Sequence, residues 1–153
     1  MKLFALQKAT ISFHFSLFSL HSSKFAINFD VAIFIKQYKK RILLVKKKIL
    51  AISGPTAVGK TALAIRLAEE LDGEIISCDS MQIYKGMDIG TAKPTREELS
   101  RVRHHMIDVV SPDVDFSCAE YKVMATAAVE DILSRGKLPI FCGGTGLYLE
   151  SVL

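Results

Sequence analysis

Cysteine is scarce in this sequence, with three residues among 153. Cys78, Cys118 and Cys142 lie far apart and lack the spacing of a metal site. Two of them fall in apolar, strand-like runs, where a buried structural thiol is a commoner role than a reactive one. An odd and sparse cysteine count is typical of a reducing compartment, so we expect a cytoplasmic protein.

Long apolar runs are missing as well. A transmembrane helix needs about 20 mostly apolar residues, and polar residues between His21 and Asp30 interrupt every such window near the N-terminus. The apolar run 11–20 alternates in part, which predicts one marginal strand, but no A-x-A-like cleavage site follows it. Arg41 is the one arginine of residues 1–45, too few for a transit peptide. We therefore expect no contact with a membrane.

Acidic residues are nearly absent from the first 45 positions. Seven basic side chains stand there against Asp30, a balance of +6, whereas residues 46–153 carry 13 basic and 15 acidic side chains, a balance of −2. A broad basic surface for nucleic acid is therefore not predicted in residues 46–153. Seven of the nine phenylalanines also lie in residues 1–45. We interpret residues 1–45 as an extension outside the functional domain, translated from a misplaced start, and residues 46–153 as the domain.

A phosphate-binding loop is the clearest motif that is present. Residues 54–61 read G-x-x-x-x-G-K-T, between an apolar run at 49–53 and a helical pattern at 60–71. Such a turn points backbone N–H groups and a helix N-terminus at one anion. Lys60 can reach the outer phosphates, and the Thr61 hydroxyl can hold Mg²⁺. The predicted phosphate-binding residues are Gly54, Pro55, Thr56, Ala57, Val58, Gly59, Lys60 and Thr61.

Strand and helix patterns alternate from residue 49 onward. A capping box at Ser117 and Glu120 starts one helix, and a short helix is predicted after Thr95. Alternation of this kind favours an α/β fold with a parallel sheet flanked by helices on both faces. The predicted strands are 49–53, 74–78, 105–110 and 138–142, and the predicted helices are 60–71, with Gly73 as its stop, 117–136 and a last turn after 143–146.

Polar residues follow two of the predicted strands directly. Asp79 comes after the second strand and Thr145 after the fourth, and ligands of parallel sheets gather at the carboxyl ends of the strands. We therefore expect both to lie beside the phosphate loop. Asp79 can act as a general base, as a helix cap or as a Mg²⁺ ligand, and Thr145 as a ligand contact or a helix cap; spacing alone does not decide.

Charged and titratable residues elsewhere have simpler interpretations. His104 and His105 lead into a strand without a second group of metal ligands, so core or edge histidines are expected. Lys85 and Lys93 are interpreted as solvated charges, or as phosphate contacts if their loop binds RNA.

Four motifs together resemble the tRNA dimethylallyltransferases, also called isopentenyl-tRNA transferases. The resemblance covers about residues 47–153, and the second motif is highly specific. The motifs are SGPTAVGKT at 53–61, SCDSMQIYKGMDIGTAKP at 77–94, HHMID at 104–108 and GGTGLY at 143–148. The resemblance implies a P-loop NTPase-like parallel sheet flanked by helices, here truncated.

The resemblance also implies a reaction and its residues. The reaction would move a dimethylallyl group from dimethylallyl diphosphate to the exocyclic N6 amine of the adenosine beside the tRNA anticodon, after that base flips out of its stack. Mg²⁺ would assist at Thr61, and the partner would be the tRNA anticodon stem-loop, bound by a monomer. The implied catalytic residues are Asp79 as general base, Lys60 and Thr145, and the implied tRNA contacts are Asp79, Ser80, Met81, Gln82 and Thr145.

Two other enzymes share the phosphate loop. A small-molecule or nucleotide kinase would need an arginine-rich lid later in the chain, and an adenylate isopentenyltransferase would prenylate free nucleotides. The stretch Asp88–Pro94 resembles the tRNA type. Because the family continues well beyond Leu153, we expect this chain to be a fragment that is inactive, or nearly so, by itself. A non-catalytic phosphate-binding remnant is the alternative outside the enzymes.

Overall fold

The computed structural model describes residues 49–54 and 57–153 of the chain. The predicted extension at 1–45, with its marginal strand, lies outside these residues, as do Pro55 and Thr56. The elements are β1 (Leu50–Ser53), α2 (Lys60–Leu71), β2 (Gly73–Ser77), α3 (Arg96–Arg101), β3 (His104–His105), α4 (Cys118–Ser134), β4 (Leu138–Gly143) and α5 (Gly146–Val152).

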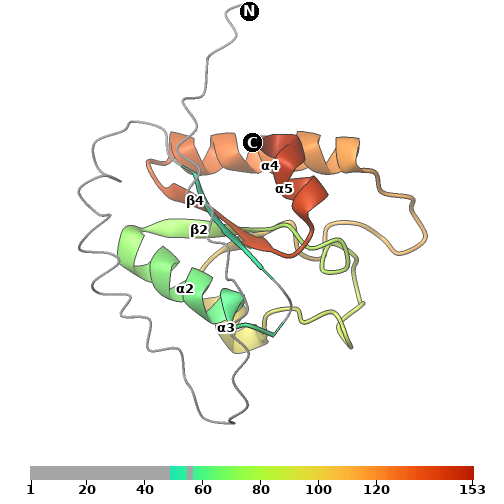
Figure 1. Cartoon of the computed structure of the whole chain (residues 1–153), viewed down its shortest axis with the longest axis horizontal. Coiled ribbons are helices and arrows are strands. Elements are labelled where there is room, and N and C mark those ends of the chain that lie inside the picture. Colours follow the sequence, from blue (N-terminus) through green and yellow to red (C-terminus); the bar gives the residue numbers. More distant parts are fainter. Residues whose placement is uncertain (1–48, 55–56) are drawn as a thin grey trace, which may run out of the picture.

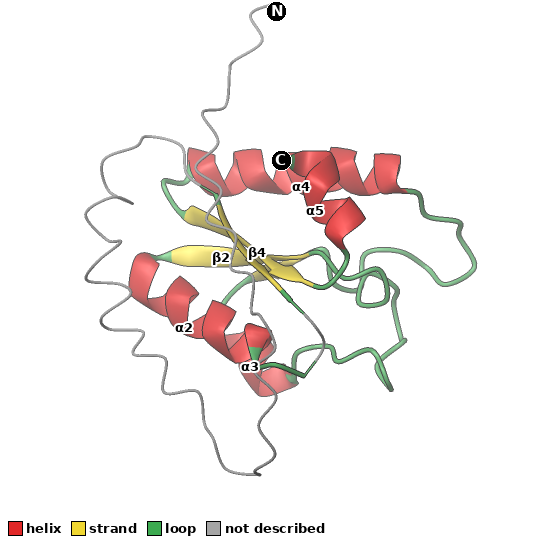
Figure 2. Cartoon of the chain, in the orientation of Figure 1, coloured by secondary structure: helices red, strands yellow, loops and turns green. Residues whose placement is uncertain are grey.

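The four strands form one parallel sheet in the order β1-β4-β2-β3. Figure 1 shows α2 and α3 on one side of the sheet and α4 and α5 on the other, and the colours of Figure 2 separate these three layers. The predicted parallel sheet with helices on both faces is therefore confirmed. Within the described ranges, no helix is long and apolar enough to cross a membrane.

Strands β1, β2 and β4 send alternate side chains to two separate cores, because successive residues of a strand face opposite ways. In β4, Ile140 packs with Ile65 of α2 in one core, and Phe141 packs with Tyr121 of α4 in the other. All four side chains are at most 1% exposed. Burial on both faces explains why β1 and β4 read as mainly apolar runs rather than as alternating ones.

Capping residues place the helix starts. Ser117 and Glu120 form the predicted capping box of α4, and Thr95 and Glu98 form a second one at α3. Helix α2 covers the predicted residues and begins after Gly59, whose φ of 86° lies in the left-handed region that favours glycine. These local signals fix where the chain turns from loop to helix.

Two boundaries differ from those predicted. The expected strand at 105–110 is wrong beyond its start, because β3 ends at His105 and the left-handed Met106 and Asp108 (φ 63° and 54°) turn the backbone out of an extended path. Further along, Val110 pairs with Tyr84 in an isolated parallel bridge outside the named strands. The expected stop of α2 at Gly73 is also wrong, since Asp72 caps the helix and Gly73 already begins β2.

A buried carboxylate lies at the start of β2, at the amino end of the sheet. The Glu74 side chain is 5% exposed and accepts hydrogen bonds from both terminal nitrogens of Arg135. His105 Nε2 lies 2.7 Å from its Oε2, and Arg103 Nε lies 4.0 Å away. The Arg135 hydrogen bonds hold the pKa of Glu74 at about 2, below its ordinary 4.5, although burial by itself would raise it. This carboxylate ties β2, α4 and β3 together.

Replacing Glu74 should remove a pH-dependent part of the stability. Since its folded pKa is depressed, its contribution is fully present above pH 4.5 and is lost as the pH falls towards 2. Between about pH 6 and pH 2, the free energy of unfolding of the natural chain should fall by about 3 kcal/mol more than that of Glu74→Gln. Urea unfolding measures this, with Glu70→Gln on the exposed side of α2 as the control. Parallel pH profiles for the natural chain and Glu74→Gln would contradict the assignment.

Candidate functional site

The carboxyl ends of β1, β4 and β2 meet at one edge of the sheet. Ser53 of β1 pairs with Gly143 of β4, and Ser77 of β2 pairs with Cys142. The segments that leave these strands therefore start side by side. They are the phosphate loop after β1, the turn at 144–145 after β4 and the Asp79 turn after β2.

Gly143 allows the closest of these approaches. A Cβ atom built there would lie 2.6 Å from both the carbonyl carbon and the carbonyl oxygen of Cys78, distances that real Cβ atoms do not show. A Cβ on Gly144 would lie 3.7 Å from the carbonyl oxygen of Gly54, an ordinary contact. The missing side chain at Gly143 thus lets β4 cross directly beneath the residue before Asp79.

Thr145 holds the Asp79 turn from both sides. The Thr145 N–H donates to the carbonyl oxygen of Cys78 at 3.0 Å, and the Ser80 N–H donates to Thr145 Oγ1 at 3.1 Å. Thr145 is the N-cap residue of α5, but its side chain makes no capping hydrogen bond. The Thr145 hydroxyl therefore does not cap the helix. Thr145 instead fixes Cys78 and Ser80, the two residues that flank Asp79.

Asp79 itself closes a tight turn. Its Oδ1 accepts a hydrogen bond from the Met81 N–H at 2.9 Å, two residues further along. Ser80 is half-buried, and Met81 is 44% exposed. The carboxylate is thus held by its own loop and is partly open to solvent. In the described residues after Asp79, no helix begins until α3, which excludes the helix-cap alternative for it.

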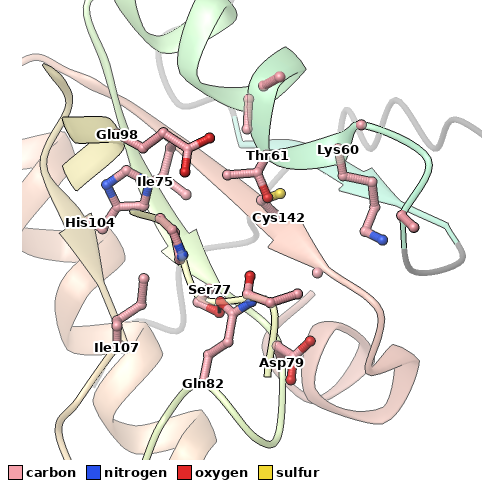
Figure 3. Close-up of a pocket in the computed structure, with 17 residues that line it drawn as sticks. Lys60, Thr61, Ile75, Ser77, Asp79, Gln82, Glu98, His104, Ile107 and Cys142 are labelled. Carbon is pink, nitrogen blue, oxygen red and sulfur yellow. Dashed lines mark hydrogen bonds between the residues drawn. The ribbon is translucent and has the colours of Figure 1, made fainter. Parts of the chain in front are cut away.

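A cavity of about 350 Å³ opens between these segments and α2. Figure 3 shows the Lys60 ammonium, the Thr61 hydroxyl and the Asp79 carboxylate around it. The structure thus brings the phosphate loop and Asp79 together, as the strand order predicts. Thr145 lies behind the Asp79 turn and is not a lining residue. The remaining lining residues are Ala57, Gly59, Ala62, Ala64, Ile75, Ser77, Gln82, Ala92, Pro94, Glu98, His104, Ile107, Cys142 and Gly143.

The oxygen atoms at this cavity suit a magnesium ion that arrives with phosphates. Mg²⁺ in phosphate sites usually takes one or two protein oxygens and completes its shell with phosphate oxygens and water. Thr61 and Asp79 offer a hydroxyl and a carboxylate. No group of three or more His, Cys, Asp or Glu side chains that could enclose a metal occurs in residues 49–54 and 57–153. The residues therefore fit a shared ion rather than an all-protein metal centre.

The long segment after Asp79 is fixed by two polar side chains whose role the sequence analysis missed. The Lys93 side chain is 7% exposed, and its ammonium contacts Asp88 at 2.9 Å, Asp108 at 2.6 Å and the carbonyl oxygen of Tyr84 at 2.7 Å. Interpreting Lys93 as a solvated charge is therefore wrong. Gln82 is also buried, with both ends of its amide bonded inside the protein. Each partner is 5 to 15 residues away in sequence, so no local pattern identifies it.

The two histidines have structural partners, in line with the expected core or edge positions. His105 is paired with Glu74, and the Nδ1 of His104 lies 2.8 Å from the carbonyl oxygen of Val102. Burial lowers the pKa of His104, which favours the neutral form of the ring. It forms part of the cavity wall beside Glu98 and Ile107 (Figure 3).

Cys78, which follows β2, and Cys142 of β4 are both buried at the site. Burial raises the pKa of Cys78 to about 12 and that of Cys142 to about 11. Both thiols therefore stay protonated at neutral pH, and since the thiolate is the reactive form, the predicted structural role is supported.

Comparison with known proteins relates this geometry to a family. Residues 82–153 match the family model described as IPP transferase. The tRNA dimethylallyltransferase of Roseiflexus castenholzii is 65% identical to this chain over 105 residues. Over these residues the chain is similar to the IPP transferase family. Its P-loop NTPase-like fold, suggested by the motifs, agrees with the solved structures of the family.

Two of those structures illustrate the agreement. The tRNA isopentenylpyrophosphate transferase of Bacillus halodurans is 53% identical, with a TM-score of 0.67, over 71% of this chain and 35% of its own. A eukaryotic dimethylallyltransferase acting on tRNA is 40% identical, with a TM-score of 0.67, over 69% of this chain and 26% of its own. The match to the Roseiflexus relative covers 69% of this chain and 34% of that protein. The chain thus spans about a third of the length of the relatives that it matches.

The two neighbouring glycines at this site, Gly143 and Gly144, should respond differently to alanine. Gly143→Ala forces a methyl group into the Cys78 backbone, so we expect a loss of about 1–3 kcal/mol in unfolding free energy and a displaced Asp79 turn. Gly144→Ala meets only an ordinary contact and should cost less than about 0.5 kcal/mol. Chemical denaturation with NMR shifts of the Ser80 and Met81 amides measures both effects. Equal costs at the two positions would contradict the close-approach argument.

Proposed function

We propose that this chain supplies the donor site and the general base of a tRNA dimethylallyltransferase. One observation carries the proposal: the Asp79 carboxylate lines the same cavity as the Lys60 and Thr61 side chains. A phosphate loop alone suits many nucleotide-binding enzymes, but a carboxylate fixed beside it can take a proton from an attacking nucleophile. The names of the Roseiflexus and eukaryotic relatives support a prenyl group as the one that moves and tRNA as the acceptor.

The proposed reaction is a substitution at the first carbon of dimethylallyl diphosphate. The exocyclic amine of adenosine forms a bond to this carbon while the carbon–oxygen bond to diphosphate breaks. Diphosphate leaves with the electron pair, and Asp79 accepts the proton released by the amine. Lys60 and the N–H groups at the start of α2 stabilise the negative charge that develops on the leaving group.

Magnesium would add to this stabilisation. When bound, the ion neutralises part of the diphosphate charge. Thr61 would contribute its hydroxyl oxygen, because it is the first-turn residue of α2 beside Lys60. Lys60 and Thr61 keep the tasks that they have in any phosphate loop, and the proposed ligand alone differs.

The acceptor would approach from the Asp79 turn. Met81 is exposed there, and the half-buried Ser80 and Thr145 lie behind it. An adenosine of the anticodon stem-loop would need to leave its base stack to reach Asp79, at a cost of a few kcal/mol that is lowest in a single-stranded loop. A cytoplasmic monomer acting on tRNA is part of this proposal.

Donor binding separates this proposal from a kinase. With Mg²⁺ present, the chain should bind dimethylallyl diphosphate at least about tenfold more tightly than ATP, a difference of about 1.4 kcal/mol. Lys60→Ala should abolish most of that affinity. Isothermal titration measures both ligands, with the exposed Lys85→Ala as the control cation. Tighter binding of ATP together with ATP hydrolysis would favour the kinase instead.

Replacing Asp79 should reveal the base. The transfer assay uses a full-length chimera in which residues 47–153 replace their counterpart in the Roseiflexus enzyme, because the chain alone spans a third of that relative. Asp79→Asn should lower the rate of prenyl transfer to an anticodon stem-loop RNA by about 10²–10⁴-fold and leave donor affinity within about twofold. A tenfold loss of donor affinity with little change in the transfer rate would assign Asp79 to donor binding instead. In a separate assay, prenyl transfer by the unmodified 153-residue chain would contradict the expectation that this chain is inactive by itself.

A further inference from the structure

Both ends of the Gln82 side-chain amide form hydrogen bonds inside the protein. Its Oε1 accepts from the Ser77 hydroxyl at 2.9 Å, and its Nε2 donates to the carbonyl oxygens of Thr91 at 3.3 Å and Ala92 at 2.9 Å. An amide nitrogen has two hydrogens, so neither is left to donate to a base or a phosphate. The residue is 9% exposed. The two N–H groups of the amide are thus bonded within the protein, although the residue also lines the cavity.

The backbone of the same residue joins a third segment. The Asp108 N–H donates to the carbonyl oxygen of Gln82 at 3.1 Å. One residue later, the carbonyl oxygen of Ile83 accepts from the N–H groups of Val109 and Val110. Gln82 therefore connects the end of β2, the loop at 91–92 and the segment at 108–110. At Gln82, these three segments are not joined to one another by the regular hydrogen bonding of a β-sheet.

The loop at 91–92 needs such a connection. Ala92 has a φ of 48°, a left-handed conformation that costs roughly 1–2 kcal/mol for a residue with a side chain. Ala92 and Pro94 line the cavity, and Gln82 follows Asp79 by three residues. Its hydrogen bonds therefore set the distance between one wall of the cavity and the turn that holds the carboxylate.

We propose that Gln82 is a positioning residue that holds the cavity wall at Ala92–Pro94 against the Asp79 turn, in place of the tRNA contact implied by the family resemblance. The purpose of this positioning rests on the proposed function, because the wall and the carboxylate would enclose the donor and the acceptor amine. The anchoring itself is a property of the free chain. It can therefore be tested without either substrate.

The chemistry of the amide suggests the decisive substitution. Two carbonyl oxygens face Nε2, so a hydrogen-bond donor is required at that position. Gln82→Glu has nearly the same shape, but its ionised carboxylate would place an acceptor against both carbonyls. When protonated, the carboxyl group regains one O–H donor. If anchoring is lost at neutral pH and partly returns in acid, the hydrogen bonds of residue 82 are its cause. Anchoring that was lost through poorer packing alone would not return in acid.

Amide hydrogen exchange of the full 153-residue chain provides the measurement. The reporters are the amides of Lys85, Asp108 and Val109, which bond to Val110, Gln82 and Ile83. In Gln82→Glu at pH 7, their protection factors should fall by about tenfold or more, since an unpaired buried carbonyl costs about 1–3 kcal/mol. The amide of Cys78, bonded to Cys142 in the sheet, should be unchanged. Protection of the reporters should partly return at about pH 4.

Two further variants complete the design. Gln82→Met removes the hydrogen bonds without adding charge and should lose protection equally at both pH values. Met81→Ala changes the exposed neighbour and should leave protection unchanged. Asp79, Asp108, Glu98 and His104 are other ionisable side chains of this region, so every comparison is made with the natural chain at the same pH.

Affinity for anticodon stem-loop RNA separates positioning from contact. If Gln82 is a positioning residue, Gln82→Glu should lower RNA affinity only when amide protection is also lost. Both RNA affinity and protection should then partly return in acid. A fall in RNA affinity with unchanged protection would show a direct contact between Gln82 and RNA, and would overturn the proposal. The proposal would also be overturned if neither protection nor RNA affinity changed in Gln82→Glu. If the natural chain binds neither RNA nor dimethylallyl diphosphate while protection responds as expected, the anchoring stands and the proposed function fails.

Discussion

The close contact between the backbones of Gly143 and Cys78 is the constraint on which the site depends. It lets β4 pass directly under the end of β2, where a methyl group in place of the glycine hydrogen would overlap the Cys78 carbonyl. Because β4 also pairs with β1, the same contact brings the phosphate loop to within reach of Asp79. Thr145 then uses one N–H and one hydroxyl to fix the residues on either side of Asp79.

Polar side chains, rather than apolar packing, shape the other wall of the cavity. The segment between β2 and α3 contributes few residues to the two cores, and Gln82 and Lys93 hold it through buried hydrogen bonds and ion pairs. Such contacts are directional, so they define one arrangement of a loop where apolar contacts would permit several. A buried ammonium or amide that loses its partner is costly, which makes this arrangement stable as long as all partners are present.

Local chemistry made much of this structure predictable from the sequence. The phosphate loop, the helix at 60–71 and the Ser117 capping box depend on neighbouring residues, and the structure confirms the elements that they imply. The T-x-x-E pattern at Thr95 would have identified the cap of α3 in the same way. The left-handed Met106 and Asp108 carry no local signal, because neither is glycine, and they ended the predicted third strand early. The partners of Gln82 and Lys93 come from chain folding and cannot be read from spacing.

The central claim is that this cavity holds a prenyl diphosphate with its reacting carbon towards Asp79. The most direct measurement is an experimental structure of the chain with Mg²⁺ and a slowly reacting analogue of dimethylallyl diphosphate. The account predicts diphosphate against the N–H groups of residues 57–61, with Lys60 and Thr61 in contact, and the first carbon of the prenyl chain facing the Asp79 carboxylate. A diphosphate bound elsewhere, or a prenyl chain directed away from Asp79, would contradict it.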